Sequence, residues 1–332
     1  MKSPERILVR ATNWVGDAVM SIPALRHIRA TFPAAHLTVL ALPSITGLYE
    51  RDRFADSVIA YTGRWRAARE LSRRRFDLAI LLPNSFDSAL TPWLARIPHR
   101  VGYNRDGRRL LLTRAIAPPH SGEVPRHQSF YYLELLRRAG WLDALPENVT
   151  IRLDALDDAR AEGARLLDTP AIGVSPGAAY GSAKRWHADR FAEAAARVAN
   201  ELGASVAIFG TQGERELCES VRVMIEHRGL PSRNLEGATS LQQFIAMAAA
   251  CRAFLTNDSG AMHIASALGV PTVAVFGATD NIATGPTGPF ARVVREPVHC
   301  SPCLLRECPI DHRCMTRVTP DRVALVALDL LK

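Results

Sequence analysis

Short apolar runs alternate along the chain with segments whose apolar residues recur every three or four positions. In the first half, runs rich in Val, Ile and Leu predict strands at 7–10, 37–42, 57–61, 78–82 and 100–103. Helical patterns lie near 18–31, 65–74, 88–95 and 128–139. This spacing is typical of βαβ units, so it predicts a parallel sheet with helices on both faces.

The second half repeats this alternation. Strands are predicted at 171–175, 205–209, 253–256 and 272–276, and helices near 188–202, 214–228, 241–250 and 262–268. A less regular stretch, 141–170, favours a boundary between domains at 1–150 and 151–332. We therefore expect an α/β protein of two Rossmann-like domains, with a ligand cleft between the carboxyl ends of their sheets. A Pro-started amphipathic helix, 320–331, can pack back on a domain, and the first domain is the candidate.

Composition narrows the class of protein. The chain has 332 residues, of which 48% are hydrophobic and 22% charged, as in globular proteins. Its net charge of +8 fits nucleic acid, an anionic membrane surface, or an acidic substrate that is either small or lipid-linked. No helix-turn-helix, zinc finger or aromatic single-strand platform is evident, so we do not expect nucleic acid. No apolar run is long enough to span a bilayer and no signal-peptide core is present, so we expect a cytoplasmic protein.

The six cysteines are unevenly placed. Four of them, Cys300, Cys303, Cys308 and Cys314, form a C-x2-C-x4-C-x5-C pattern. This spacing could hold zinc, with His299 and His312 as spare ligands, but zinc ribbons usually contain two C-x2-C pairs. Reduced thiols in a packed loop are the alternative, and the sequence leaves the two open.

The stretch from Asn257 to His263 reads as a strand, a polar turn and a helix start. Asp258 and Ser259 are good N-cap residues, and Gly260 lets a ligand approach the backbone. A helix N-terminus offers unpaired N–H groups and a positive dipole end to a phosphate. An ordinary capped helix explains the turn equally well when it is taken alone.

Two more strand-end loops of the second half carry candidate groups. The loop from Ser175 through Gly177 to Lys184 offers backbone N–H groups and a point charge to a diphosphate. Glu214 follows a glycine turn and could bind ribose hydroxyls, or simply begin a helix. No D-x-D sequence occurs, so we expect no divalent metal, because Lys184 and the helix start could neutralise a leaving diphosphate.

In the first half, the loop after the first strand contains Gly16 and Asp17, and matches neither the dinucleotide fingerprint nor the Walker loop. Asp17 could take a proton from a sugar hydroxyl, or it could only complement the dipole of the following helix.

Taken together, these loops resemble glycosyltransferase family nine, the ADP-heptose:lipopolysaccharide heptosyltransferases. The resemblance covers nearly the whole chain and rests on motifs at 15–18, 22–25, 175–178, 184–186, 209–210, 257–263 and on the cysteine-rich segment. It implies a GT-B fold, no required cofactor, and an inverting transfer of heptose from ADP-heptose. Asp17 matches the catalytic base. The residues matching the donor site are Lys184, Glu214, Asp258, Ser259, Gly260, Ala261, Met262, His263, Ser175 and Gly177.

The same resemblance implies an acceptor built on lipid A, carrying Kdo and heptose, and it favours addition of the second heptose. Acidic groups on such an acceptor fit the basic clusters at 64–66, 73–75 and 105–109, and we expect a peripheral location at the anionic inner face of the inner membrane.

Two other functions stay open: a GT-B enzyme with another donor or an epimerase, and a non-catalytic nucleotide-binding protein. Candidate acceptor contacts are Asn13, Trp14, Tyr103, Arg105 and Arg108.

Overall fold

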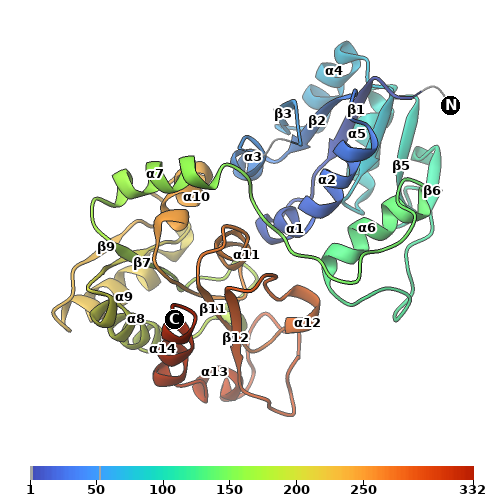
Figure 1. The fold of residues 1–332 in the computed structure, drawn as a ribbon. Helices are drawn as coiled ribbons and strands as arrows, with labels where there is room; N and C mark the ends of the chain where they lie inside the picture. Colours follow the sequence, from blue (N-terminus) through green and yellow to red (C-terminus); the bar gives the residue numbers. More distant parts are fainter. Residues whose placement is uncertain (1–2, 52–53) are drawn as a thin grey trace. The chain divides into compact units, whose positions relative to one another are not determined.

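A computed structural model describes residues 3–51 and 54–332. The chain divides into two compact units between Val149 and Thr150, one residue before the boundary expected from the sequence. Each unit is an α/β layer structure built on its own six-stranded sheet (Figure 1).

The first sheet has the order β3-β2-β1-β4-β5-β6, and all its neighbouring strands run parallel. This order reverses direction between β1 and β4, as in a Rossmann fold. Its strands are β1 (Arg6–Arg10), β2 (His36–Ala41), β3 (Ser57–Ala60), β4 (Leu78–Leu81), β5 (His99–Tyr103) and β6 (Arg114–Ile116).

Helices cover both faces of this sheet. Leu71 and Ala89, from α4 and α5, pack on Leu8, Leu40 and other buried residues of one sheet face. Helices α1, α2 and α6 pack against one another. The helices of this unit are α1 (Val15–Met20), α2 (Ile22–Thr31), α3 (Thr46–Tyr49), α4 (Arg64–Arg74), α5 (Phe86–Leu94) and α6 (Gln128–Arg138).

The second sheet repeats the topology in the order β12-β11-β10-β7-β8-β9, again parallel throughout. Its direction reverses between β7 and β10. The strands are β7 (Ala171–Ser175), β8 (Ser205–Ile208), β9 (Ser232–Asn234), β10 (Phe254–Asn257), β11 (Thr272–Phe276) and β12 (Ala291–Arg295).

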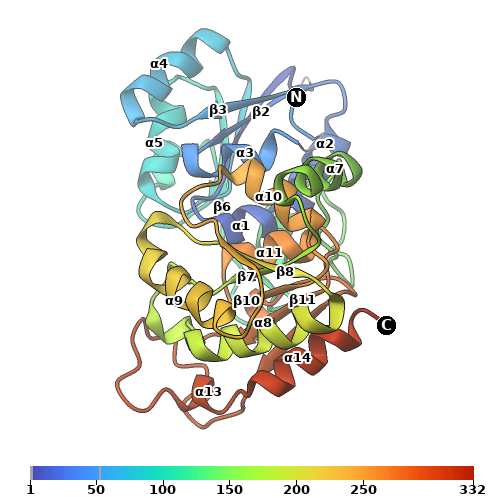
Figure 2. The same ribbon diagram turned by 90° about the vertical axis from the view of Figure 1, so that its left-hand side faces the viewer.

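One face of this sheet is covered by α8, α9 and α14, whose apolar residues share a core with β7, β8, β10 and β11. Helices α8 and α14 lie side by side (Figure 2). The buried face of α14 therefore packs within the second unit. The helices are α7 (Leu156–Leu167), α8 (Ala188–Leu202), α9 (Arg215–Glu226), α10 (Leu241–Ala250), α11 (Gly260–Ala267), α12 (Asn281–Thr284), α13 (Arg313–Thr316) and α14 (Pro320–Asp329).

The α/β class and the parallel sheets predicted from the sequence are confirmed, with local corrections. The single helix predicted at 18–31 is two helices that join at Ser21, because Pro23 lacks an N–H and favours a new helix start. Strands β6, β9 and β12 were not predicted. Each contains arginine, so none shows the apolar run by which a buried strand is found.

Helices α7 and α10 pack closely because Gly163 has no side chain. A Cβ at Gly163 would lie 1.9 Å from the backbone oxygen of Ala246. We expect Gly163→Ala to lower the free energy of unfolding by about 1–3 kcal/mol, as in other overpacked cores. The control is Gly213→Ala, since a Cβ there meets nothing within 4 Å. Chemical denaturation of both variants measures the difference, and equal stabilities would contradict the packing argument.

Candidate sugar-nucleotide site

The carboxyl ends of β7 and β10 lie side by side at the centre of the second sheet, where its strand order reverses. Ligands of parallel α/β sheets bind at this position. Two loops meet there: residues 176–187, which we call the donor loop, and the turn Asp258–Ser259 before α11. The structure thus brings together the second-half motifs that the sequence analysis selected.

Asn257 joins these two loops. It is fully buried, its Oδ1 accepts a hydrogen bond from the Trp186 N–H at 2.9 Å, and its Nδ2 donates to the Pro176 oxygen at 2.7 Å. A buried amide with both ends satisfied fixes its neighbours, because a lost bond would leave an unpaired polar group. Asn257 therefore holds both ends of the donor loop against β10. Sequence reasoning quoted this residue within the motif but assigned it no role.

Lys184 and Asp258 form an ion pair across the two loops. The Lys184 Nζ lies 2.6 Å from the Asp258 Oδ2, and the side chains are 14% and 5% exposed. The Thr279 hydroxyl donates to the same oxygen at 2.6 Å. Thr279 lies beyond β11, and its sequence neighbourhood gave no signal of this contact. Removing one partner of such a buried ion pair destabilises the protein strongly, because the other charge is left buried and unpaired.

The start of α11 presents its first turn at the same place. Ser259 is the N-cap, and its hydroxyl lies 3.2 Å from that of Thr256. Gly260 and Ala261 are partly exposed, whereas His263 is buried and the Met262 side chain packs with Ala274 and Phe276. Met262 can therefore contribute only its backbone to a ligand at this turn.

Glu214 lies against Gly177. A Cβ on Gly177 would fall 1.9 Å from the Glu214 Oε1, so a side chain at this position would displace the carboxylate from its present place. The Glu214 Oε2 accepts bonds from the Thr211 N–H at 2.8 Å and the Thr211 hydroxyl at 3.0 Å. Glu214 thus caps a short helical turn, and its other oxygen lies against Gly177, two residues after the buried Ser175 at the end of β7.

In the first unit, Asp17 lies in the first turn of α1, after the β1 loop. Its Oδ1 accepts a hydrogen bond from the Tyr132 hydroxyl at 3.0 Å. Burial, together with the Asp17 carboxylate, holds the pKa of Tyr132 well above its usual value, so this phenol stays a donor. Asn13 and Trp14 are exposed on the same loop, where Asn13 accepts a bond from Arg10.

Two of the expected acceptor contacts have structural roles instead. Arg108 is fully buried and donates to the Tyr103 oxygen at 2.9 Å and to the Ser88 hydroxyl at 2.8 Å. Tyr103 is buried as well, and its hydroxyl donates to the Tyr131 oxygen. Both side chains are thereby withdrawn from solvent, which argues against them as acceptor ligands, while Arg105 is exposed. The sequence does not reveal that Arg108 is buried, because it stands in a cluster of arginines of the kind usually found on the surface.

The cysteines are free thiols. In the described ranges, 3–51 and 54–332, no group of three or more His, Cys, Asp or Glu side chains is arranged to hold a metal ion. Cys300, Cys303 and Cys308 are partly exposed, and Cys314 is buried.

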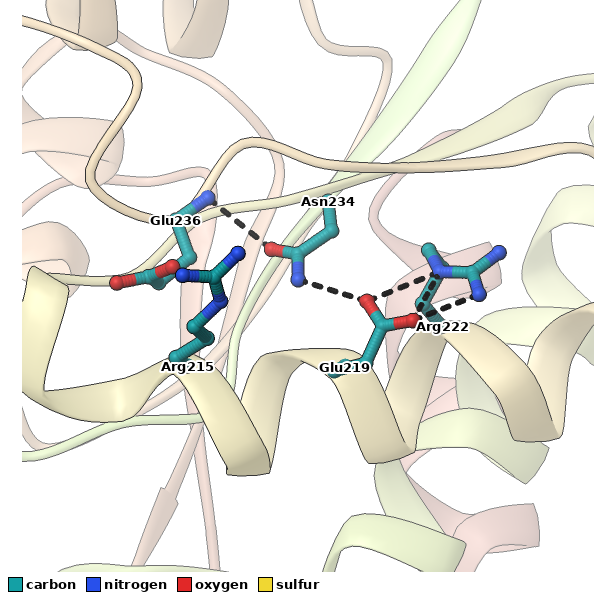
Figure 3. Close-up of a pocket in the computed structure, with 5 residues that line it drawn as sticks. All are labelled: Arg215, Glu219, Arg222, Asn234 and Glu236. Atoms are coloured by element: carbon teal, nitrogen blue, oxygen red, sulfur yellow. Dashed lines mark hydrogen bonds and ion pairs between the residues drawn. The ribbon is translucent and has the colours of Figure 1, made fainter.

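A hollow on the second unit is lined by charged residues of α9 and the β9 region (Figure 3). Arg222 donates to Glu219 at 2.7 Å, and Asn234 donates to it at 3.0 Å. Bonds from Arg222 and Asn234 lower the pKa of Glu219 to about 2. Arg222 and Glu219 form an ion pair, and no expected site residue lines the hollow, so we do not assign it to the sugar-nucleotide site.

Comparison with known proteins places the chain in a family. The model of glycosyltransferase family 9 (heptosyltransferase) matches residues 64–313. The lipopolysaccharide heptosyltransferase 2 of Salmonella typhimurium is 33% identical, with 87% of this chain and 88% of that protein covered. The lipooligosaccharide heptosyltransferase 2 of Haemophilus ducreyi is 32% identical, with the same coverage. The solved structure of E. coli ADP-heptose lipopolysaccharide heptosyltransferase II superposes with a TM-score of 0.83 at 32% identity, covering 98% of each chain.

The chain therefore belongs to glycosyltransferase family 9, the heptosyltransferases, and its fold is GT-B. The family expected from the sequence is confirmed. Along the described part of the chain, no helix is both long and apolar enough to cross a bilayer.

Burial divides the thiols into two classes. It raises the pKa of Cys218 and of Cys251 to about 12, and burial with the neighbouring Cys300 raises that of Cys314 to about 11. At pH 8 only about one Cys218 thiol in ten thousand is ionised, and the thiolate is the reactive form. We expect a disulfide reagent to label the three partly exposed cysteines of the folded protein first. Mass mapping of the labelled sites checks this, and early labelling of Cys218 or Cys251 would contradict it.

Proposed function

We propose that this glycosyltransferase transfers heptose from ADP-heptose to the inner core of lipopolysaccharide with inversion, and that it adds the second heptose. The observation that carries the proposal is the paired Lys184 and Asp258 beside the start of α11, in a chain whose relatives are named heptosyltransferase 2. The cation and the helix N-terminus suit a diphosphate, and the nearby carboxylates suit sugar hydroxyls.

On the donor side, Lys184 and the backbone N–H groups from Ser259 to His263 would bind the diphosphate. Asp258 uses its Oδ2 for Lys184 and Thr279, and its Oδ1 has no hydrogen-bond partner within the described residues. That oxygen is then available to a hydroxyl of the transferred sugar. Glu214, which bonds Thr211 through Oε2 alone, offers Oε1 to the ribose beside Gly177 and Ser175.

On the acceptor side, Asp17 would act as the general base. In one displacement, its carboxylate takes the proton of the acceptor hydroxyl while that oxygen forms a bond to the anomeric carbon. The bond from this carbon to the β-phosphate oxygen breaks, and its electron pair leaves with ADP. Lys184 and the helix start stabilise the departing charge, so neither a covalent sugar–enzyme intermediate nor a divalent metal is required.

Asp17→Asn tests the base directly. The amide cannot take a proton but keeps the size of the side chain and can still bond to Tyr132. We expect turnover to fall by about 10²- to 10⁴-fold, the usual contribution of a positioned base, with ADP affinity unchanged. The matched control is Asp143→Asn, which changes an exposed carboxylate of the same unit. Near-normal transfer by Asp17→Asn would remove Asp17 as the base.

We also propose that the first unit meets an anionic membrane, where a lipid-linked acceptor lies. Helix α4 turns Leu71 and its two alanines to the core, and it presents Trp65, 71% exposed, together with Arg66, Arg69 and Arg73. These arginines form no ion pair with any described residue. The adjacent α5 exposes Phe86 and Trp93 at a spacing of about two turns. Aromatic rings with cationic neighbours are typical of interfacial binding to anionic lipid.

Vesicle cosedimentation measures this contact. We expect the protein to bind vesicles that contain phosphatidylglycerol, to bind neutral phosphatidylcholine vesicles weakly, and to lose binding when Arg66, Arg69 and Arg73 become Gln. The control makes the same change at three exposed arginines of the second unit, Arg152, Arg160 and Arg165. Equal loss in both variants would indicate only a net-charge effect. Transfer to a delipidated acceptor should survive in either variant.

A further inference from the structure

The donor loop is held by residues 296–312, a segment without helix or strand that we call the cysteine-rich segment. The Ala183 N–H donates to the Arg306 oxygen at 2.9 Å, and the Tyr180 hydroxyl donates to the Leu304 oxygen at 2.7 Å. A third hydrogen bond joins the His312 Nε2 to the Ala183 oxygen at 3.0 Å. Lys184 is the next residue along the loop. The cysteine-rich segment therefore fixes the place of that lysine.

The contact at Arg306 is made by its backbone. A Cβ on Gly181 would fall 2.2 Å from the Arg306 oxygen, so the loop can approach this closely only because Gly181 has no side chain. Because the oxygen that receives the Ala183 N–H is also backbone, neither contact uses the guanidinium. The side chain of Arg306 is thus not needed to hold the loop.

The guanidinium lies instead beside the ring of Tyr180. Its Cζ is 5.5 Å from the ring centroid, and the Lys184 Nζ is 4.9 Å from the same centroid. Both distances are within the range of cation–π attraction, so one tyrosine holds two cations in place. Tyr180 is 39% exposed and Arg306 is exposed, so this arrangement faces solvent and is open to a ligand.

The charges of Lys184, Arg306 and Asp258 do not cancel. Lys184 is paired with Asp258, whereas Arg306 has no carboxylate partner among the residues described. Two cations and one carboxylate leave an excess of one positive charge beside the proposed diphosphate site. Two like charges held around one ring repel each other, and an anion bound between them relieves that repulsion. A guanidinium also matches phosphate oxygens through two parallel N–H bonds, which an ammonium cannot make.

We infer that Arg306 is a second cationic ligand of the donor diphosphate, and that Tyr180 is the residue that positions Arg306 and Lys184 around it. This inference rests on the proposed function, because it takes a nucleoside diphosphate sugar as the donor. It assigns to the cysteine-rich segment a direct part in donor binding in addition to its support of the loop.

Calorimetric titration of the full chain with ADP and with adenosine tests the assignment. A charge-assisted bond to phosphate predicts that Arg306→Ala weakens ADP binding on the order of ten- to a hundredfold and leaves adenosine binding unchanged. Arg306→Lys should recover part of the loss. The charge-matched control is Arg317→Ala, which removes an exposed arginine of the same unit and should bind ADP like the parent protein.

Three results would overturn the inference. Parent-like ADP affinity in Arg306→Ala would show that the guanidinium does not reach the phosphates. An equal loss for ADP and adenosine would show that the variant distorts the loop and removes no phosphate contact. Failure of the parent protein itself to bind ADP would overturn the proposed function along with this inference. The first two results, in which the parent protein binds ADP, would overturn the inference alone.

Discussion

The buried side chain of Asn257 is the constraint on which the candidate site depends. It bonds to both ends of the donor loop from the last position of β10, at the point where the sheet changes direction. These two bonds join the donor loop to the end of β10, and the cysteine-rich segment holds the same loop at Tyr180 and Ala183. With them, Lys184 comes within 2.6 Å of Asp258, and the start of α11 lies at the same sheet edge. The end of β10, the donor loop and the Lys184–Asp258 ion pair therefore depend on one another for their positions.

This arrangement explains how a diphosphate site can form without a metal ion. Lys184 is only 14% exposed, so its charge acts in a medium that screens it less than water does. Asp258, which accepts a hydrogen bond from Thr279, orients Lys184 before any ligand arrives, and this reduces the reorganisation needed on binding. The cysteine-rich segment then places Arg306 beside the ring of Tyr180, which Lys184 also contacts. In the proposed donor site, a fixed set of cations would take the place of the ion that other sugar-nucleotide sites use.

The sequence predicted the repeated α/β pattern and the loops at the strand ends, because short apolar runs and turn residues report local structure. It could not report contacts between distant segments. Thr279 bonds to Asp258, and Arg306 contacts the donor loop, both from far along the chain. Nothing near Thr279 marks its contact, and the cysteine spacing around Arg306 pointed to a metal and not to the donor loop. For the same reason Arg108 and Tyr103 looked like surface ligands, although the fold buries both among carbonyl groups. The local spacing of Asn257 to His263 indicated where the candidate site lies, and only tertiary packing shows the residues that support it.

Transfer from ADP-heptose to a Kdo- and heptose-containing lipid A acceptor, assayed with excess EDTA, tests the central claim most directly. We predict that sugar transfer continues in the chelator, that it releases ADP, and that UDP-sugars do not replace the donor. A requirement for added divalent cation would contradict the metal-free diphosphate site. Absence of transfer from ADP-heptose to this acceptor, with or without cation, would contradict the proposed function.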